Sequence, residues 1–332
     1  MRDAASAVLI AAVEGLELTP DEERFFREES PAGVTLFRRN IPQDHYSQVG
    51  RLNQSLQNLR HGDEPPMVIA IDQEGGRVSR IAAPFPNLGP AMTIADGCTN
   101  SSALKILNQY GHDVGQELRQ LGINVNFAPV LDVLSEPTNT AIGDRCFGVT
   151  ADQVTVRAQA FLEGLQSEKV LGCLKHFPGQ GNACVDTHHT TAMIEASLQT
   201  LITREMAPFR DLVQKCPMVM ISHSIFPVLC DTEASRSRTI IMDWLRMRFG
   251  FDGVVVSDDM NMGALPQEMK AWKAALIDAV RAGCDALLVC RGLDRCHEAL
   301  DALRSEAKRN HAFAVRLDDA AKRVTKMRRS LV

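Results

Sequence analysis

The stretch Gly253–Asp258 reads Gly-Val-Val-Val-Ser-Asp, a glycine and three β-branched residues followed by a serine and a carboxylate. A short apolar run of this kind is typical of a strand buried on both faces of a parallel sheet. Seven other runs of five or six residues share its apolar character: Ala7–Ala12, Gly33–Phe37, Met67–Asp72, Asn124–Ala128, Gly172–His176, Met218–His223 and Ala286–Cys290. Together they predict eight buried, parallel strands.

Segments with helical spacing lie between most of these runs. In Ser102–Leu121, leucine, isoleucine and valine recur along one stripe of a helix. Thr150 followed by Gln153 is the pattern of a capping box, which predicts a helix from there to Leu165. Further helices are expected at Phe209–Gln214, Trp244–Phe249, Trp272–Ala282, Ala299–Ala307 and Leu317–Arg329.

The alternation of strands and helices over 332 residues predicts an α/β fold, a (β/α)8 barrel in which residues 1–332 form one domain. A doubly wound sheet is the alternative. That fold usually has fewer strands and a glycine-rich turn after the first of them. Neither Gly-x-Gly-x-x-Gly nor a P-loop pattern occurs in the chain, so the barrel is favoured.

Composition narrows the classes of partner and compartment. The 36 basic and 41 acidic residues give a formal net charge of −5, which argues against a nucleic-acid footprint. No apolar run approaches the roughly 18 residues that span a bilayer. Nine cysteines without a Cys-x-x-Cys pair fit reduced thiols, and Ala7–Val13 is interpreted as a buried strand rather than a signal segment. We therefore expect a cytoplasmic protein that binds neither nucleic acid nor membrane, and its oligomeric state is unknown.

Polar side chains follow the apolar runs at a recurring place. Taken singly, each fits a solvated charge at the beginning of a loop. In a barrel, however, the carboxyl ends of all strands open on one face, so these side chains converge on one pocket. The positions concerned are Asp72, Asp132, Lys175-His176, Ser222-His223 and Ser257-Asp258-Asp259.

The segment that begins with Asp72 contains the glycine pair Gly75-Gly76, which permits a tight turn and close approach of backbone to a ligand. Asp72 and Arg80 lie on either side of this pair as an acceptor and a fork-shaped donor, a combination suited to sugar hydroxyls or a carboxylate. An ordinary turn with a surface ion pair is the alternative.

The segment Lys175–Thr191 is rich in glycine and polar residues, so we expect a long loop over the mouth of the pocket. Asp186 and His188 are two residues apart in it. A carboxylate can hold an imidazole in one tautomer, which gives a group able to transfer protons near neutral pH. A solvated pair or metal ligands are the alternatives, but neither His-x-His nor His-Glu-x-x-His is present.

Asp258 stands at the tip of the apolar run Gly253–Asp258, where a carboxylate is held rigidly, as a carboxylate nucleophile requires. Strand alternation would turn the neighbouring Asp259 away from the pocket. The alternative is that one of the two aspartates caps a helix.

Six motifs in this order resemble glycoside hydrolase family 3, and more narrowly the single-domain bacterial β-N-acetylglucosaminidases of peptidoglycan recycling. The resemblance covers nearly the whole chain, from about Ala7 to the helices after Cys290. The motifs are Ile71-Asp72-Gln73-Glu74-Gly75-Gly76-Arg77-Val78, Asn126-Phe127-Ala128-Pro129-Val130-Leu131-Asp132, Arg145-Cys146-Phe147-Gly148, Lys175-His176-Phe177-Pro178-Gly179, Asp186-Thr187-His188 and Ser257-Asp258-Asp259-Met260.

The resemblance implies a retaining exo-glycosidase that needs neither cofactor nor metal and takes a small N-acetylglucosamine-containing glycan. It implies that Asp258 is the catalytic nucleophile, His188 the general acid/base and Asp186 the partner of that histidine. It further implies that five residues hold the sugar: Asp72, Arg80, Arg145, Lys175 and His176.

Three positions depart from the family pattern, one of them Ala12, which stands where the first strand usually has an acidic residue. Gln180 stands where members commonly have histidine, which affects the positioning of the loop more than the chemistry, and Thr187 replaces a serine. Other functions stay open: another β-glycosidase, a phosphorylase in which phosphate intercepts the glycosyl-enzyme, or a non-catalytic sugar-binding protein. A metal-dependent barrel hydrolase or aldolase would use His176, His188, His189 and His223.

Overall fold

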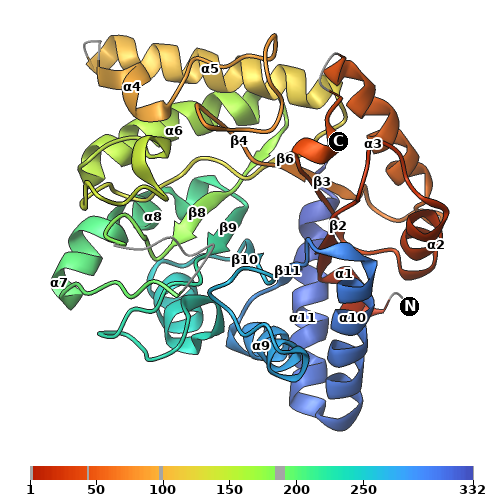
Figure 1. The fold of residues 1–332 in the computed structure, drawn as a ribbon. Helices are drawn as coiled ribbons and strands as arrows, with labels where there is room; N and C mark the ends of the chain where they lie inside the picture. The colour runs from red at the N-terminus through yellow and green to blue at the C-terminus, as the bar shows by residue number, and fades with distance from the viewer. Residues whose placement is uncertain (1–2, 43–44, 97–99, 184–190, 332) are drawn as a thin grey trace.

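The computed structural model describes residues 3–42, 45–96, 100–183 and 191–331, and in these ranges the strands form one nine-stranded sheet surrounded by helices (Figure 1). Every neighbouring pair in this sheet is parallel. The strands are β1 (Leu9–Ala11), β2 (Gly33–Leu36), β3 (Val68–Ile71), β6 (Val125–Asn126), β7 (Leu171–Gly172), β8 (Leu174–Phe177), β9 (Met218–Ile221), β10 (Val254–Asp259) and β11 (Ala286–Leu288). A separate antiparallel hairpin pairs β4 (Gln73–Gly75) with β5 (Val78–Ser79).

The sheet closes on itself through an interruption in one strand. Its order begins with β7 and ends with β8, and only Cys173 separates these two segments in the chain. Gly172 pairs with β6, whereas Leu174 pairs with β9. In the described residues, β7 and β8 are therefore the halves of one strand, and the sheet is an eight-stranded parallel barrel, which confirms the predicted (β/α)8 fold.

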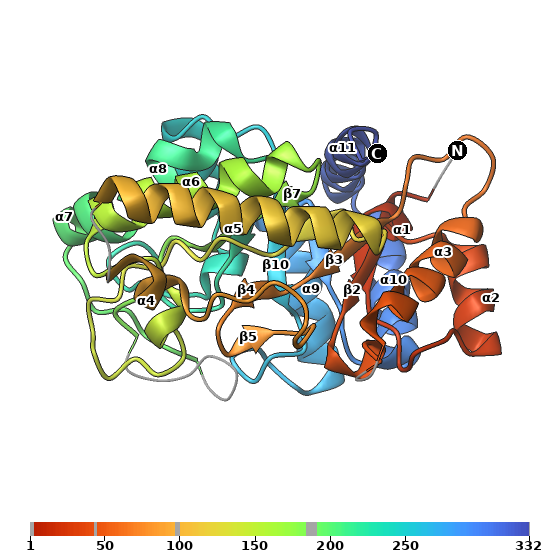
Figure 2. The same ribbon diagram turned by 90° about the horizontal axis from the view of Figure 1, so that it is seen from above.

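Helices cover the outer face of the barrel, and α5 runs alongside α6 over one side of it (Figures 1 and 2). The α-helices are α1 (Ala4–Ala7), α2 (Pro20–Glu29), α3 (Val49–Asn58), α4 (Ala91–Asp96), α5 (Asn100–Gln120), α6 (Ala151–Ser167), α7 (Leu198–Thr200), α8 (Ala207–Leu212), α9 (Met269–Ala282), α10 (Gly292–Arg309) and α11 (His311–Arg328). Two π-helical segments are η4 (Leu201–Glu205) and η7 (Thr239–Arg248). Short 3-10 turns are η1 (Arg38–Asn40), η2 (Tyr46–Gln48), η3 (Gly143–Arg145), η5 (Val213–Lys215) and η6 (Ala234–Arg236).

Alternate residues of each strand point into the barrel and fill it. The inward row forms one buried cluster, which includes Val68 and Ala70 of β3 and Val254 and Val256 of β10. Three residues from the end of the chain close this cluster from one side: Val324, Met327 and Leu331. The remaining strand residues pack against the helices in a second, larger cluster. Both faces of the strands are buried, as the unbroken apolar runs predict.

Each predicted strand is present, but three local expectations were wrong in detail. The strand predicted at Ala7–Ala12 begins too early, because Asp3 caps the short helix α1 before β1 starts. Thr150 does accept a hydrogen bond from the Gln153 N–H, but the Gln153 side chain accepts from Val149 rather than completing a capping box. The helix expected at Trp244–Phe249 is part of the longer π-helical η7.

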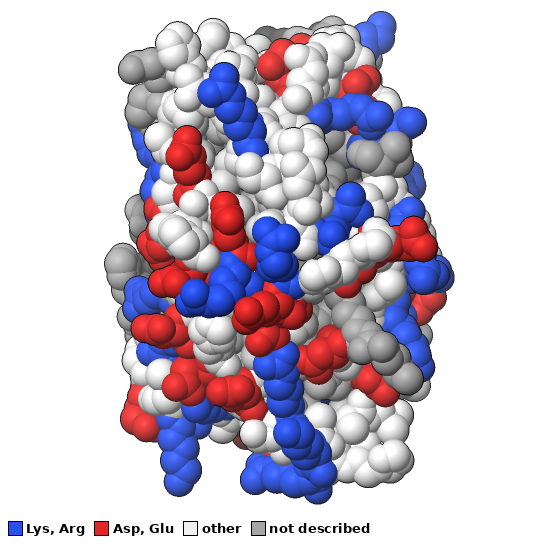
Figure 3. All heavy atoms as spheres, turned by 90° about the vertical axis from the view of Figure 1, so that its right-hand side faces the viewer, with Lys and Arg blue, Asp and Glu red and all other residues white. Residues whose placement is uncertain are grey.

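Charges of both signs are interspersed on the side of the molecule that carries α2 and α3 (Figure 3). None of the described helices combines the length and the apolar character needed to cross a membrane. All seven cysteines that the structure describes are free thiols.

Candidate active site

The inward rows of β3 and β10 end in two carboxylates. Asp72 is two residues beyond Ala70, and Asp258 is two residues beyond Val256, so both continue the inward row toward the carboxyl ends of the strands. A cavity of about 170 Å³ opens there. Its polar lining residues are Asp72, Glu74, Arg80, Arg145, Lys175, His176, Gln180 and Asp258. We refer to this part of the cavity as the charged half.

Lys175 joins two acidic side chains at the base of the charged half. Its Nζ lies 2.7 Å from Asp72 Oδ1 and 2.6 Å from Glu74 Oε1, and its side chain is almost fully buried. Arg80 Nη2 donates to the other oxygen of Asp72 at 3.1 Å. Asp72 is thus fixed between two cations that come from different parts of the chain.

Arg145 reaches the charged half from η3 and is held by Glu74. Its Nε and Nη2 donate to the two oxygens of Glu74, each at 2.8 Å, which is the bidentate geometry of a strong ion pair. The same hairpin holds the backbone of this loop, because Arg77 Nη2 donates to the carbonyl oxygens of Thr140, Ala141 and Ile142. The hairpin β4–β5 therefore positions both the side chain and the loop of Arg145.

The cations control the ionisation of the two acids. Burial by itself would raise the pKa of Asp72, but Lys175 and Arg80 outweigh it and hold this pKa well below the ordinary value. Burial opposes ionisation of Glu74 in the same way, and Arg145 with Lys175 lowers its pKa to about 2. Both acids are charged at neutral pH, so they accept hydrogen bonds, while Lys175 and Arg145 donate them.

His176 forms one wall of the charged half and is bonded from behind. Its Nδ1 lies 2.7 Å from Oδ2 of Asp132, a fully buried carboxylate. Gln180 is also buried, and its Oε1 accepts hydrogen bonds from the hydroxyl groups of Ser222 and Ser224 at 2.9 and 3.2 Å. Gln180, one of the residues that depart from the family pattern, is therefore fixed in place by its own contacts.

The two neighbouring aspartates of β10 differ in what they contact. Asp258 faces the cavity and accepts a hydrogen bond from the Asp259 N–H at 2.8 Å. The carboxylate of Asp259 instead accepts from the backbone and side chain of Asn261 and from the Cys290 N–H. Buried His223 contacts the Asp259 carbonyl oxygen through Nε2 at 3.2 Å. Asp259 therefore stabilises the turn that follows Asp258.

Apolar side chains line the space on the other side of Asp258. This adjoining cavity of about 330 Å³ shares Asp72, Arg80, Met220 and Asp258 with the charged half. Its other lining residues are mostly apolar: Thr35, Phe37, Phe127, Asp259, Met262, Leu288 and Cys290. We call it the apolar half. Asp258 thus lies where a charged and an apolar compartment meet.

The structure brings together six of the residues singled out in the sequence, namely Asp72, Arg80, Arg145, Lys175, His176 and Asp258. Asp186 and His188 lie outside the described residues. Glu74 was not assigned a role from the sequence, although its position two residues after Asp72 in the same glycine hairpin was a usable signal. Among the apolar residues of the second half, Phe127 lies in one of the quoted motifs, whereas Phe37, Met262 and Leu288 lie in none.

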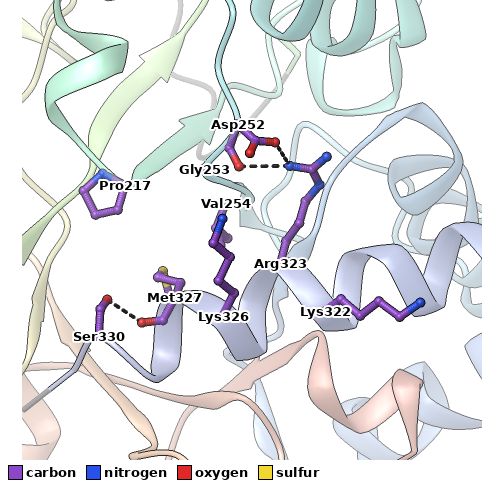
Figure 4. Close-up of a pocket in the computed structure, with 9 residues that line it drawn as sticks. All are labelled: Pro217, Asp252, Gly253, Val254, Lys322, Arg323, Lys326, Met327 and Ser330. Atoms are coloured by element: carbon purple, nitrogen blue, oxygen red, sulfur yellow. Dashed lines mark hydrogen bonds and ion pairs between the residues drawn. The ribbon is translucent and has the colours of Figure 1, made fainter.

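A different hollow, of about 530 Å³, lies at the opposite end of β10, where the strand begins (Figure 4). Three cations of α11 line it, and Arg323 pairs with Asp252, while Lys322 and Lys326 come from the same helix. It contains none of the predicted site residues. Within the described ranges, His, Cys, Asp and Glu side chains do not gather in a group of three or more that could hold a metal ion.

Comparison with known proteins gives consistent matches. The model of the glycosyl hydrolase family 3 N-terminal domain matches residues 11–327. A β-hexosaminidase of Tolumonas auensis is 32% identical over 305 residues, which cover 90% of this chain and 86% of the relative. A family 3 β-N-acetylglucosaminidase from a Paenibacillus species matches with a TM-score of 0.92 and 32% identity over 99% of this chain, although the chain spans only 62% of that protein. NagZ from Neisseria gonorrhoeae, solved in complex with N-trifluoroacetyl-D-glucosamine, matches with a TM-score of 0.80 and 29% identity over 96% of this chain and 97% of its own.

Proposed function

The chain belongs to glycosyl hydrolase family 3, and on that premise we propose that it is a retaining exo-β-N-acetylglucosaminidase. It removes terminal, non-reducing N-acetylglucosamine from β-linked glycans through a covalent glycosyl-enzyme on Asp258. The β-hexosaminidase of Tolumonas auensis and the gonococcal protein with its bound N-acylglucosamine support this choice of sugar.

The observation that carries the proposal is the position of Asp258 between the two halves of the cavity. A carboxylate that attacks the anomeric carbon C1 lies close to the substituent on C2, its neighbour in the ring. The apolar half offers Phe37, Met262 and Leu288 to the methyl group of an acetamido substituent. The charged half offers alternating donors and acceptors to the ring hydroxyls.

The reaction proceeds in two displacements. Asp258 attacks C1, the bond from C1 to the leaving-group oxygen breaks, and His188 supplies the proton that this oxygen takes up. His188 then removes a proton from water, whose oxygen attacks C1 while the bond from C1 to Asp258 breaks and the carboxylate leaves. Two inversions at C1 give net retention. Asp186 orients His188 in this scheme, and both assignments rest on the family resemblance, because the two residues lie outside the described ranges.

We also propose that the natural substrates are muropeptides and that the protein acts in the cytoplasm. The resemblance of the six sequence motifs to bacterial enzymes of peptidoglycan recycling supports the choice of muropeptides. The free thiols of the described cysteines support a reducing compartment.

Hydrolysis of an aryl β-N-acetylglucosaminide beside the matching aryl β-glucoside tests the choice of sugar. We expect kcat/KM for the acetamido sugar to be higher by about two orders of magnitude, because its methyl group can bury apolar surface against Phe37, Met262 and Leu288, whereas a hydroxyl at C2 cannot. A preference for the glucoside would contradict the proposal.

Asp258→Asn tests the nucleophile. The variant keeps the shape of the side chain but removes the attacking carboxylate, so we expect kcat to fall by about 10⁴ or more. A fluorinated N-acetylglucosaminyl fluoride should label Asp258 in the native enzyme, as mass spectrometry of its peptides would show. Asp252→Asn, at the far end of the barrel, is the control and should keep full activity. Label on any other side chain would refute the assignment.

His188→Ala tests the acid. A nitrophenolate leaves without protonation, whereas a sugar alkoxide does not, so the variant should lose much more activity on a disaccharide than on a nitrophenyl glycoside. Steady-state kinetics on the two substrates measures the difference. Equal losses would show that His188 does not donate the proton.

A further inference from the structure

Asp132 lies behind the wall of the charged half and makes no contact that the reaction itself requires. The carboxylate is fully buried, and among the described residues its ion-pair partner is His176. One oxygen, Oδ2, lies 2.7 Å from His176 Nδ1. The other, Oδ1, accepts from the backbone N–H of Gln180 at 2.8 Å and from that of His176 at 3.4 Å. Each oxygen thus has a separate task.

The bond to Oδ2 decides which hydrogen-bonding group His176 presents to the cavity. An ionised carboxylate only accepts hydrogen bonds, so the hydrogen on a neutral imidazole must lie on Nδ1. The second ring nitrogen, Nε2, is then an acceptor. Because His176 lines the charged half, this acceptor faces the space that the proposed function gives to the sugar.

An acceptor at this place complements the neighbouring side chains. Lys175 and Arg145 are donors without acceptor capacity, and they line the same space. A sugar hydroxyl has one hydrogen to donate and two lone pairs. Such a hydroxyl can accept from a neighbouring cation and donate its hydrogen to Nε2, so its hydrogen and one of its two lone pairs are used.

We propose that Asp132 is a positioning residue, which holds His176 in the tautomer with hydrogen on Nδ1 so that Nε2 accepts a hydrogen bond from a hydroxyl of the substrate. The inference rests on the proposed function, in which His176 holds the sugar. It adds a residue that acts through His176 and does not itself touch the substrate.

Asp132→Asn isolates the effect on the tautomer of His176. The contacts that Oδ1 makes with two backbone N–H groups fix the orientation of the new amide. The N–H groups of Gln180 and His176 need an acceptor, so the amide oxygen stays on their side. The amide NH₂ then faces Nδ1 and donates to it, which moves the ring hydrogen to Nε2. The variant therefore replaces an acceptor in the cavity with a donor while the backbone contacts remain.

Nitrogen-15 NMR of histidine-labelled protein at about pH 8, where a free imidazole is neutral, reads the tautomer directly. The His176 signals are identified by their loss in His176→Ala. We expect hydrogen on Nδ1 in the native protein and on Nε2 in Asp132→Asn. Hydrogen on Nε2 in the native protein, whether alone or with Nδ1, overturns the proposal, and this part of the measurement does not require Asp132→Asn to fold.

Kinetics on an aryl β-N-acetylglucosaminide shows whether the tautomer matters. We expect Asp132→Asn to lower kcat/KM by about tenfold or more, mainly through KM. The double variant with His176→Ala should be no worse than His176→Ala alone, because Asp132 acts through that ring. Asp252→Asn serves as the charge-matched control and should not change kcat/KM.

The outcomes separate the inference from the function on which it rests. Additive losses in the double variant would show that Asp132 acts independently of His176, and they would overturn the inference alone. An undiminished kcat/KM in His176→Ala would instead remove His176 from the sugar site, and with it the proposed function of that residue.

Discussion

Glu74 is the residue on which two of the three cations of the charged half, Arg145 and Lys175, converge. Arg145 binds it through two hydrogen bonds, and Lys175 approaches the same carboxylate at 2.6 Å. Its side chain is only 3% exposed, so water cannot replace these contacts. Glu74 does not need to touch the sugar in order to determine where Arg145 and Lys175, two donors of the candidate site, lie.

Glu74→Gln should therefore weaken substrate binding more than it slows the chemical step. The amide keeps the volume but loses the charge, so Arg145 and Lys175 lose the partner that orients them. We expect KM for an aryl β-N-acetylglucosaminide to rise by about tenfold or more, with a smaller change in kcat. Steady-state kinetics measures both.

Glu163→Gln provides the matched control for this prediction. Glu163 is exposed on α6, and within the described part of the chain its side chain accepts a hydrogen bond from Gln159. The same change of charge should leave KM unaltered there. An unchanged KM in Glu74→Gln would show that Arg145 and Lys175 are positioned without this carboxylate.

The π-helical segment η4 supports the turn that leads from β8 into the site. Gly179 has a φ of +115°, and a Cβ added there would lie 2.9 Å from the backbone oxygen and the Cβ of Glu205. Glu205 ends η4 and is fully buried, although Arg204 Nε donates to it at 2.6 Å. Burial outweighs the attraction of Arg204 and raises the pKa of Glu205 to about 7.

The raised pKa predicts a particular pH dependence of stability. Between the ordinary value of 4.5 and about 7, the unfolded chain releases the proton while the folded protein retains it. The folded state binds more protons in this window, so this group's contribution to the free energy of unfolding is complete below pH 4.5 and is lost as the pH rises toward 7. Glu205→Gln removes this loss, which amounts to roughly 3 kcal/mol.

Urea unfolding of both proteins between pH 4.5 and 8 tests this expectation. The native protein should lose stability relative to Glu205→Gln across the window, and the difference should become constant above it. Two parallel curves would show that folding does not raise the pKa of Glu205.

The strands were predictable from the sequence, whereas most contacts between them were not. Apolar runs such as Val254–Val256 give strands because both of their faces are buried, and the residue two positions further along lies inward by alternation. The pairing of Lys175 with Asp72 joins residues 103 positions apart, which no local spacing encodes. The role of Glu74 and the pairing of His176 with its partner also depend on contacts between residues that are distant in the sequence. The division of one strand into β7 and β8 around Cys173 depends on such contacts as well.

The two ends of the barrel perform different tasks. The carboxyl ends of the strands carry the ionisable groups of the candidate site. The end of α11 fits against the opposite part of the barrel, where Val324, Met327 and Leu331 join the interior cluster. Arg328, also on α11, is buried and donates to the carbonyl oxygens of Pro65 and Pro66 ahead of β3. Contacts that close the barrel are thereby kept apart from contacts that bind the ligand.

Asp285 connects β10, η7 and α11, which help to close the barrel. It should therefore be a determinant of stability but not of catalysis. It precedes β11, is fully buried, accepts from the Val255 N–H of β10 at 2.9 Å, and pairs with Arg246 of η7 and Arg316 of α11. Asp285→Asn removes the buried counter-charge of two largely buried guanidinium groups. We expect the free energy of unfolding to fall by about 3–5 kcal/mol.

Asp319→Asn is the control, because Asp319 also contacts Arg316 but is exposed and lies 3.6 Å away. It should change the free energy of unfolding by less than about 0.5 kcal/mol. Urea unfolding measures both variants, and kcat/KM below the unfolding transition should match the native protein in each, because neither residue lines the cavity. A small effect of Asp285→Asn would mean that hydrophobic packing alone closes the barrel, whereas a stable but inactive variant would mean that the two ends of the barrel are coupled.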